Sequence, residues 1–209
     1  MFPLKGAILL PRSMLPLNIF EPRYVMMVDE AIAGARVLAI VQPGQAQDPV
    51  ESPADKDAPL RRVAGLGRIT SFTETGDGRY LISLSGVCRC ELHQEVAMGK
   101  SYRTFAVTYN AFGDDLQVGL GEEDVDREHL LTVLRNFLTA RQMQTDWTAI
   151  SRSTNEFLVN TLSMLSPYGP EEKQALLEAK DLKTRAHVLI ALAEMQLAAP
   201  DDGSGSAIQ

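Results

Sequence analysis

The sequence predicts an α+β fold, in which a strand-rich first half is followed by a helical second half. The main observation is a change in the spacing of apolar residues. Residues 1–112 show short apolar runs and the alternation typical of strands, whereas residues 124–198 show helical spacing. Because the strands come first and the helices follow, this order favours two packed lobes over an alternating βαβ core.

We expect four segments along the chain. A β lobe covers residues 1–112, an acidic linker 113–123, a helical lobe 124–198 and a disordered tail 199–209, which contains the run PDDGSGSA. Within the β lobe, residues 43–59 form a long polar loop with four prolines, of a length that is uncommon in a compact domain.

The clearest element of the first half is a hairpin. Residues 63–75 and 79–92 flank the turn sequence Gly76-Asp77-Gly78, and the second strand alternates well. Gly86 interrupts that strand and predicts a bulge or bend. A helix is expected at residues 21–33, with Pro22 in its first turn and Gly34 at its end. Two further strands are expected at residues 36–41 and 102–111.

The second half predicts four helices. The first begins after Asp124 or Asp126 and runs to about residue 143. Ser153 and Glu156 form a capping box that opens the second. A short third helix covers residues 170–179, and Asp181 caps the last. The second helix is expected to point its leucines inward, namely Leu158, Leu162 and Leu165.

Composition argues against several classes of function. The 209 residues carry a net charge of −7, which argues against binding to nucleic-acid phosphates. Cys88 and Cys90 lie two residues apart on one strand, are poorly placed to bridge each other, and suit a reducing cytoplasm. No apolar stretch reaches the roughly 18 residues of a membrane span, and prolines and charges break the apolar N-terminus, so no signal peptide is expected. We expect a cytoplasmic protein.

The motifs of catalysis are weak or missing. Gly99-Lys100-Ser101 resembles the end of a phosphate-binding loop, but Gln94 stands where the loop needs glycine. No Gly-x-Ser-x-Gly elbow occurs, and the three histidines couple to no nucleophile in sequence. The acidic residues 114–115 and 122–124 predict a solvated linker, with weak cation binding as the alternative. We therefore expect no catalytic residue, no cofactor and no metal.

Three segments together resemble one known family. The opening contains Phe2-Pro3-Leu4, Leu15-Pro16-Leu17 and Ile19-Phe20-Glu21-Pro22-Arg23-Tyr24. The strand from Gly65 to Glu74, the turn at residues 77–79 and Gly86-Val87-Cys88-Arg89 follow, and Glu172-Lys173-Gln174-Ala175-Leu176-Leu177-Glu178 comes last. In this order they resemble the N-terminal, substrate-binding domain of Lon proteases, in the stand-alone bacterial form that lacks the ATPase and peptidase modules.

The resemblance implies a PUA-like β-barrel lobe followed by a C-terminal α-helical lobe. It also implies a non-catalytic module that binds a polypeptide substrate or a partner protein and takes part in self-association, with no membrane partner. Candidate binding residues come from the matched segments: Phe20, Glu21, Arg23, Tyr24, Arg68 and Arg89. Residues 20–24 have an alternative role, which is to hold the barrel to its helix.

The contact surface is expected in a groove between the lobes, or at the loop of residues 43–59 and the nearby barrel edge. Two other functions stay open at this point. One is a hydrolase or peptidase that acts alone, and the other is an RNA-binding PUA-like protein, which the net charge disfavours.

Overall fold

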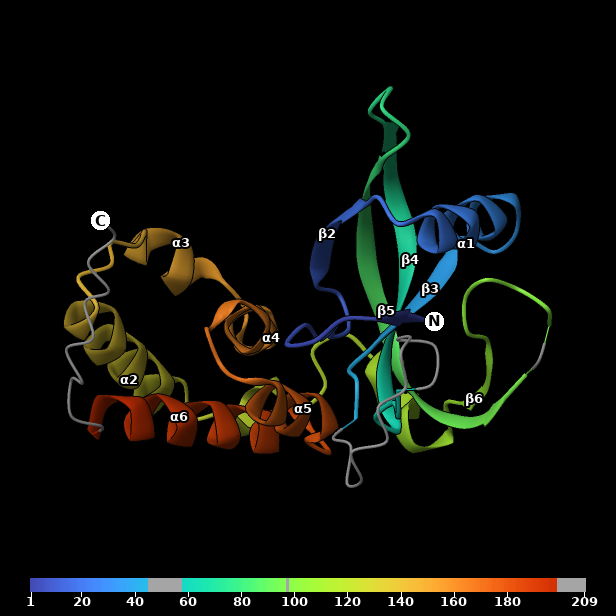
Figure 1. Ribbon diagram of the computed structural model, residues 1–209. Coiled ribbons are helices and arrows are strands. Elements are labelled where there is room, and N and C mark those ends of the chain that lie inside the picture. Colours follow the sequence, from blue (N-terminus) through green and yellow to red (C-terminus); the bar gives the residue numbers. More distant parts are fainter. Residues whose placement is uncertain (45–57, 97, 199–209) are drawn as a thin grey trace.

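The structure is a computed structural model that describes residues 1–44, 58–96 and 98–198. A sheet formed by the first half is followed by a group of helices, which confirms the predicted α+β class. Figure 1 shows helices α2–α6 gathered beside the sheet and α1 on its other side. Most of the polar loop at residues 43–59 and the whole tail at 199–209 lie outside the described residues. No helix in the described ranges has the length and hydropathy to span a bilayer.

In the described part of the chain, six strands form one sheet of order β1-β3-β4-β5-β2, with β6 paired to β5. β1 and β3 run parallel, and the other neighbours are antiparallel. The strands are β1 (Phe2–Pro3), β2 (Met14–Ile19), β3 (Val37–Val41), β4 (Val63–Glu74), β5 (Tyr80–Glu95) and β6 (Phe105–Thr108).

The predicted hairpin is the pair β4–β5. Gly76 and Gly78 both have positive φ angles in its turn, at 76° and 81°, as the turn sequence predicts. The bulge predicted at Gly86 is also present, because the register shifts there and leaves Val87 without a partner on β4. Figure 1 shows the far end of this hairpin projecting away from the rest of the molecule.

Two glycines let another segment cross the sheet in close contact. A Cβ at Gly86 would lie 1.9 Å from the carbonyl oxygen of Leu10, and one at Gly65 would lie 2.0 Å from that of Leu9. The Gly86 amide donates to the carbonyl of Ser13 at 2.8 Å. The backbone before β2 therefore takes the space of the missing side chains, and Leu9 and Leu10 are fully buried as a result.

The helices follow their capping residues. Asp126 accepts a hydrogen bond from the His129 amide, and Asp181 accepts one from the Thr184 amide, as the sequence predicts. The helices are α1 (Pro22–Ala33), α2 (Arg127–Ala140), α3 (Trp147–Arg152), α4 (Asn155–Leu165), α5 (Pro170–Glu178) and α6 (Leu182–Ala198), with 3-10 helices η1 (Asn110–Leu116) and η2 (Glu122–Asp124).

The sheet and the helices share a core. One buried cluster joins residues of η1, α2 and α4–α6 with Ile8, Leu10 and Val63 from the sheet region. Polar contacts cross the same boundary, since Gln42 donates to Gln174 at 3.1 Å and Gln174 donates to the carbonyl of Val63 at 3.2 Å. Burial of apolar surface stabilises such a boundary by about 25 cal/mol per Å².

Several predicted details were wrong. Leu165 is 77% exposed, because the buried face of α4 is centred between Val159 and Ser163 and not on the leucine stripe. The capping box was placed one residue early, since Thr154 caps α4. The last strand is shorter than predicted, because the chain turns into η1 after residue 109. Helix α3 had not been predicted.

The acidic linker differs most from expectation. Asp115 was expected in a solvated segment, but its side chain is buried and pairs with Arg89. The linker region also contains η1 and η2. This contact folds the segment back onto β5, so it packs against the sheet between the two halves.

Candidate functional site

A pocket of about 230 Å³ lies where the sheet, the linker and the helices meet. Its walls come from the segment before β2, from β5, from η1, η2 and the chain between them, and from α4 and the start of α6. The pocket lies between the two halves, which is one of the two places where the sequence analysis expects a contact surface. Five lining residues are cations: Arg12, Arg89, Lys180, Lys183 and Arg185.

Arg89 and Asp115 form the floor of the pocket. The guanidinium binds both carboxylate oxygens, with Nη2–Oδ1 at 2.7 Å and Nε–Oδ2 at 2.9 Å, and the Arg89 amide donates to Oδ2 at 2.8 Å. Nη1 also donates to the carbonyls of Leu177 and Ala179 at the end of α5. A cation is favoured at a helix C-terminus, so these two bonds stabilise the end of α5. Through them and through Asp115, Arg89 connects β5 to both α5 and η1.

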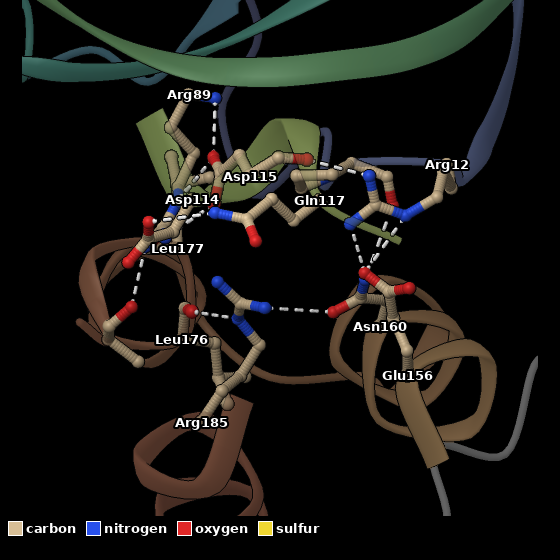
Figure 2. A network of polar contacts seen from close by, with 12 residues as sticks. Arg12, Arg89, Asp114, Asp115, Gln117, Glu156, Asn160, Leu176, Leu177 and Arg185 are labelled. Carbon is tan, nitrogen blue, oxygen red and sulfur yellow. Dashed lines mark hydrogen bonds and ion pairs between the residues drawn. The ribbon is translucent and has the colours of Figure 1, made fainter. Parts of the chain in front are cut away.

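Arg12 and Glu156 close one side. Arg12 Nε donates to Glu156 Oε1 at 2.9 Å, and Nη1 donates to the carbonyl of Asp115 at 2.6 Å. The other oxygen of Glu156 accepts from the Gly119 amide at 3.1 Å. These bonds tie the linker to the first turn of α4 (Figure 2).

Arg185 enters from α6 and is 4% exposed. Its Nε donates to the carbonyl of Leu176 at 2.9 Å, and Nη1 donates to Asn160 Oδ1 at 3.0 Å. Burial and the nearby charge of Arg89 lower the pKa of Arg185 to about 10. The side chain therefore remains a cation at neutral pH while most of its hydration is lost.

Four exposed apolar residues lie on or next to the pocket-lining segments, and we call them the rim: Leu120 lines the pocket, and Leu116, Val118 and Phe157 each adjoin a lining residue in the sequence. Leu116, Val118 and Leu120 of the linker are 65%, 81% and 48% exposed. Phe157 on α4 is 58% exposed and follows Glu156, which binds the same linker. A rim of this kind beside a polar floor is typical of a surface that contacts another molecule.

The chemistry of the pocket is that of paired ions and hydrogen-bond donors. In the described ranges, no group of three or more His, Cys, Asp or Glu side chains is placed to hold a metal ion. The nearby cysteines are free and buried, and burial raises the pKa of Cys90 to about 12 and that of Cys88 above its usual value. Both thiols stay protonated at neutral pH, which makes them poor nucleophiles.

The six candidate residues from the sequence lie in three separate places. Arg89 is in the pocket floor, and Arg68 is exposed on β4, opposite Val37 in the register. The others lie at the start of α1, where Phe20 is 62% exposed and Arg23 pairs with Glu21 at 2.8 Å.

Tyr24 is buried and packs on Phe2 with a ring distance of 4.5 Å, which suits the alternative role of holding the helix to the sheet. Sequence reasoning missed Arg12, Asp115 and Arg185. Arg185 had a signal, because it lies on the apolar face of the last helix, between Leu182 and Leu189 at helical spacing.

Two solved structures have the same architecture over nearly the whole chain. The Lon N-terminal domain protein from Xanthomonas campestris matches with a TM-score of 0.56 and 19% identity, covering 91% of this chain and 95% of that one. The N-terminal domain of a Mycobacterium avium complex Lon protease matches with a TM-score of 0.65 and 18% identity, covering 92% and 96%. The fold is therefore that of a Lon N-terminal domain.

Sequence comparison establishes the family. Residues 1–194 match the family described as the ATP-dependent protease La (LON) substrate-binding domain, and the chain belongs to it. Lon protease 2 of Sorangium cellulosum is 24% identical over 204 residues, which cover 93% of this chain and 24% of that protein. Lon protease 2 of Myxococcus xanthus is 24% identical over 196 residues, covering 91% and 22%. The chain thus spans about a quarter of the length of these relatives.

Proposed function

We propose that this chain is a non-catalytic module that binds extended polypeptide at the groove between its sheet and its helices. Membership of a substrate-binding family supports polypeptide as the ligand class. The observation that carries the location is the exposed apolar rim of Leu116, Val118, Leu120 and Phe157 beside the polar pocket. Extended chains expose apolar side chains and backbone polar groups together, so an apolar rim with a polar floor suits them.

A binding experiment tests this proposal. Fluorescence anisotropy would follow labelled, reduced and carboxymethylated α-lactalbumin, which stays unfolded, as the purified chain is added. We expect saturable binding, and replacing Leu116, Val118 and Leu120 together by serine should weaken it by at least about tenfold, because the lost apolar burial exceeds 1.4 kcal/mol. Binding that is unchanged in this triple variant would exclude the rim as the contact surface.

A matched control separates the rim from apolar exposure in general. Met143 and Met195 are 57% and 68% exposed. Met195 is near the end of α6, whose start lines the pocket, and Met143 follows α2 at that same end, where Arg141 donates to Gln196 at 3.0 Å. Replacing both by serine should leave binding unchanged. The peptidase alternative is tested in the same samples, since the proposal expects the labelled substrate to remain intact on a gel after prolonged incubation.

A further inference from the structure

Arg185 is a buried cation whose hydrogen bonds are incomplete. Nε and Nη1 donate to neutral acceptors, the Leu176 carbonyl and the Asn160 side chain. Nη2 is buried and has no hydrogen-bond partner among the described residues. An unsatisfied buried donor is costly, and more so when it belongs to a charged group. At the edge of the pocket, the Arg185 guanidinium therefore has one N–H group without an acceptor and a positive charge without a paired carboxylate.

The inner carboxylates of the pocket are committed to other partners. Asp115 uses both oxygens on Arg89, and Glu156 uses its oxygens on Arg12 and the Gly119 amide. Within the described ranges, no salt bridge joins Arg185 to any carboxylate. The charges of Arg89 and Arg12 are therefore neutralised by carboxylates of the protein, whereas the charge of Arg185 has no such partner among the described residues.

We take Gln117 as the side chain that covers the free donor. Its side chain lines the same pocket and is exposed, and Figure 2 shows its amide above the Arg185 guanidinium. Among the described residues, the Gln117 side chain makes one hydrogen bond, a long contact of 3.4 Å from Nε2 to Asp114 Oδ1. Exposed side chains change rotamer within nanoseconds, so this cover can move aside at little cost.

We propose that the free Nη2 of Arg185 binds a carboxylate of a polypeptide seated in the groove, once Gln117 has moved aside. This inference rests on the proposed function and names the group that the pocket recognises. The carboxylate comes either from the C-terminus of the polypeptide or from an acidic side chain. The exposed lining residues have a net negative charge, because four carboxylates face two lysines: Asp114, Glu123, Asp124 and Asp181 against Lys180 and Lys183. This charge repels a phosphate more than a single carboxylate, so one carboxylate on an otherwise apolar chain fits better.

Three peptides distinguish the sources of the carboxylate. All are acetylated alanine–leucine pentapeptides: one ends in a free carboxylate, one in an amide, and one in an amide with an internal aspartate. Titration calorimetry should show the free acid or the aspartate peptide binding about tenfold more tightly than the plain amide, because charge-assisted hydrogen bonds are the strong ones. Whichever acid binds better identifies the source. Equal affinities for all three would overturn the proposal.

Substitutions at Gln117 test the site without disturbing the bonds that Arg185 makes to the fold. Gln117→Glu places a carboxylate over the guanidinium and should reduce the affinity for the acid peptide to that of the amide. Gln117→Ala removes the cover and should keep or raise the preference for the acid. If Gln117→Glu retains the full preference for the acid, Arg185 is not the group that binds it.

A last arm separates this inference from the proposed function. Sodium acetate should raise the melting temperature of the wild type and of Gln117→Ala more than sodium chloride at equal ionic strength does, and should have no such effect on Gln117→Glu. If unfolded α-lactalbumin binds but neither acetate nor the acid peptide is preferred, the polypeptide function stands and the carboxylate site falls. If acetate stabilises but unfolded protein does not bind, the site stands and the proposed function falls.

Discussion

The two ends of the β4–β5 hairpin use glycine for different physical reasons. At the inner end, Gly65 and Gly86 leave room for the carbonyl oxygens of Leu9 and Leu10, which would lie about 2 Å from any added Cβ. At the tip, Gly76 and Gly78 have positive φ angles and open space around them. The inner end is therefore specified by packing against other segments, and the tip only by the local conformation of its own turn.

Charged groups follow the same division. Arg89 and Asp115 at the inner end are 3% and 7% exposed and make a bidentate pair. The exposed pair of Arg62, just before β4, and Glu91 of β5 has a single contact at 3.3 Å and a 70% exposed arginine. Buried pairs are costly to break and exposed pairs are not, so the boundary between sheet and helices should dominate the stability of the chain.

The largest expected effect comes from removing the helical half. A fragment of residues 1–112 keeps all six described strands but loses Asp115 and the helices that cover Ile8, Leu10 and Val63. We expect this fragment to be insoluble or to lack a cooperative unfolding transition, because it exposes part of the shared core and leaves Arg89 unpaired. Thermal unfolding followed by circular dichroism tests this against the full chain. A soluble fragment with a cooperative transition would show that the halves fold independently.

Asp115→Asn should be the most damaging single substitution at the boundary. It keeps the shape of the side chain but leaves the Arg89 charge buried without its partner, which costs about 3–5 kcal/mol. Urea unfolding at neutral pH gives the free energy. Glu91→Gln is the matched control, and its exposed pair is worth less than about 1 kcal/mol. Similar losses for the two substitutions would mean that water reaches the Arg89 pair.

Gly86→Ala should come next, with a loss of about 2–3 kcal/mol from overpacking against the Leu10 carbonyl. Gly78→Ala meets no atom within 4 Å and pays only for its positive φ, which costs about 1 kcal/mol. The free energies of unfolding of both variants, measured in urea, compare the cost of a steric clash at Gly86 with the cost of a positive φ angle at Gly78. A smaller loss at Gly86 than at Gly78 would show that the crossing segment can move away.

The sequence predicted those parts of the fold whose signals are local. The hairpin, the bulge at Gly86 and the caps at Asp126 and Asp181 follow from turn chemistry and periodicity within a few residues. The pocket could not be found in the same way, because Arg89 meets Asp115 only after the linker folds back onto β5. Asp115 was expected at the surface because charged side chains are usually solvated. It is buried instead, because it pairs with Arg89, which is distant in the sequence.

Helix α4 shows the same limit at a smaller scale and gives the smallest expected effect. Its leucine stripe predicted Leu165 as buried, yet Asn160 and Ser163 occupy the inner face instead, because Asn160 binds Arg185 and the carbonyl of Pro11. Leu165→Ser should therefore change the free energy of unfolding by less than about 0.5 kcal/mol, as expected for an exposed position. Leu158→Ala on the buried side should cost about 2–5 kcal/mol. A loss above 1.5 kcal/mol for Leu165→Ser in urea unfolding would mean that this side of α4 is covered in solution, by a second copy of the chain if the loss grows with protein concentration.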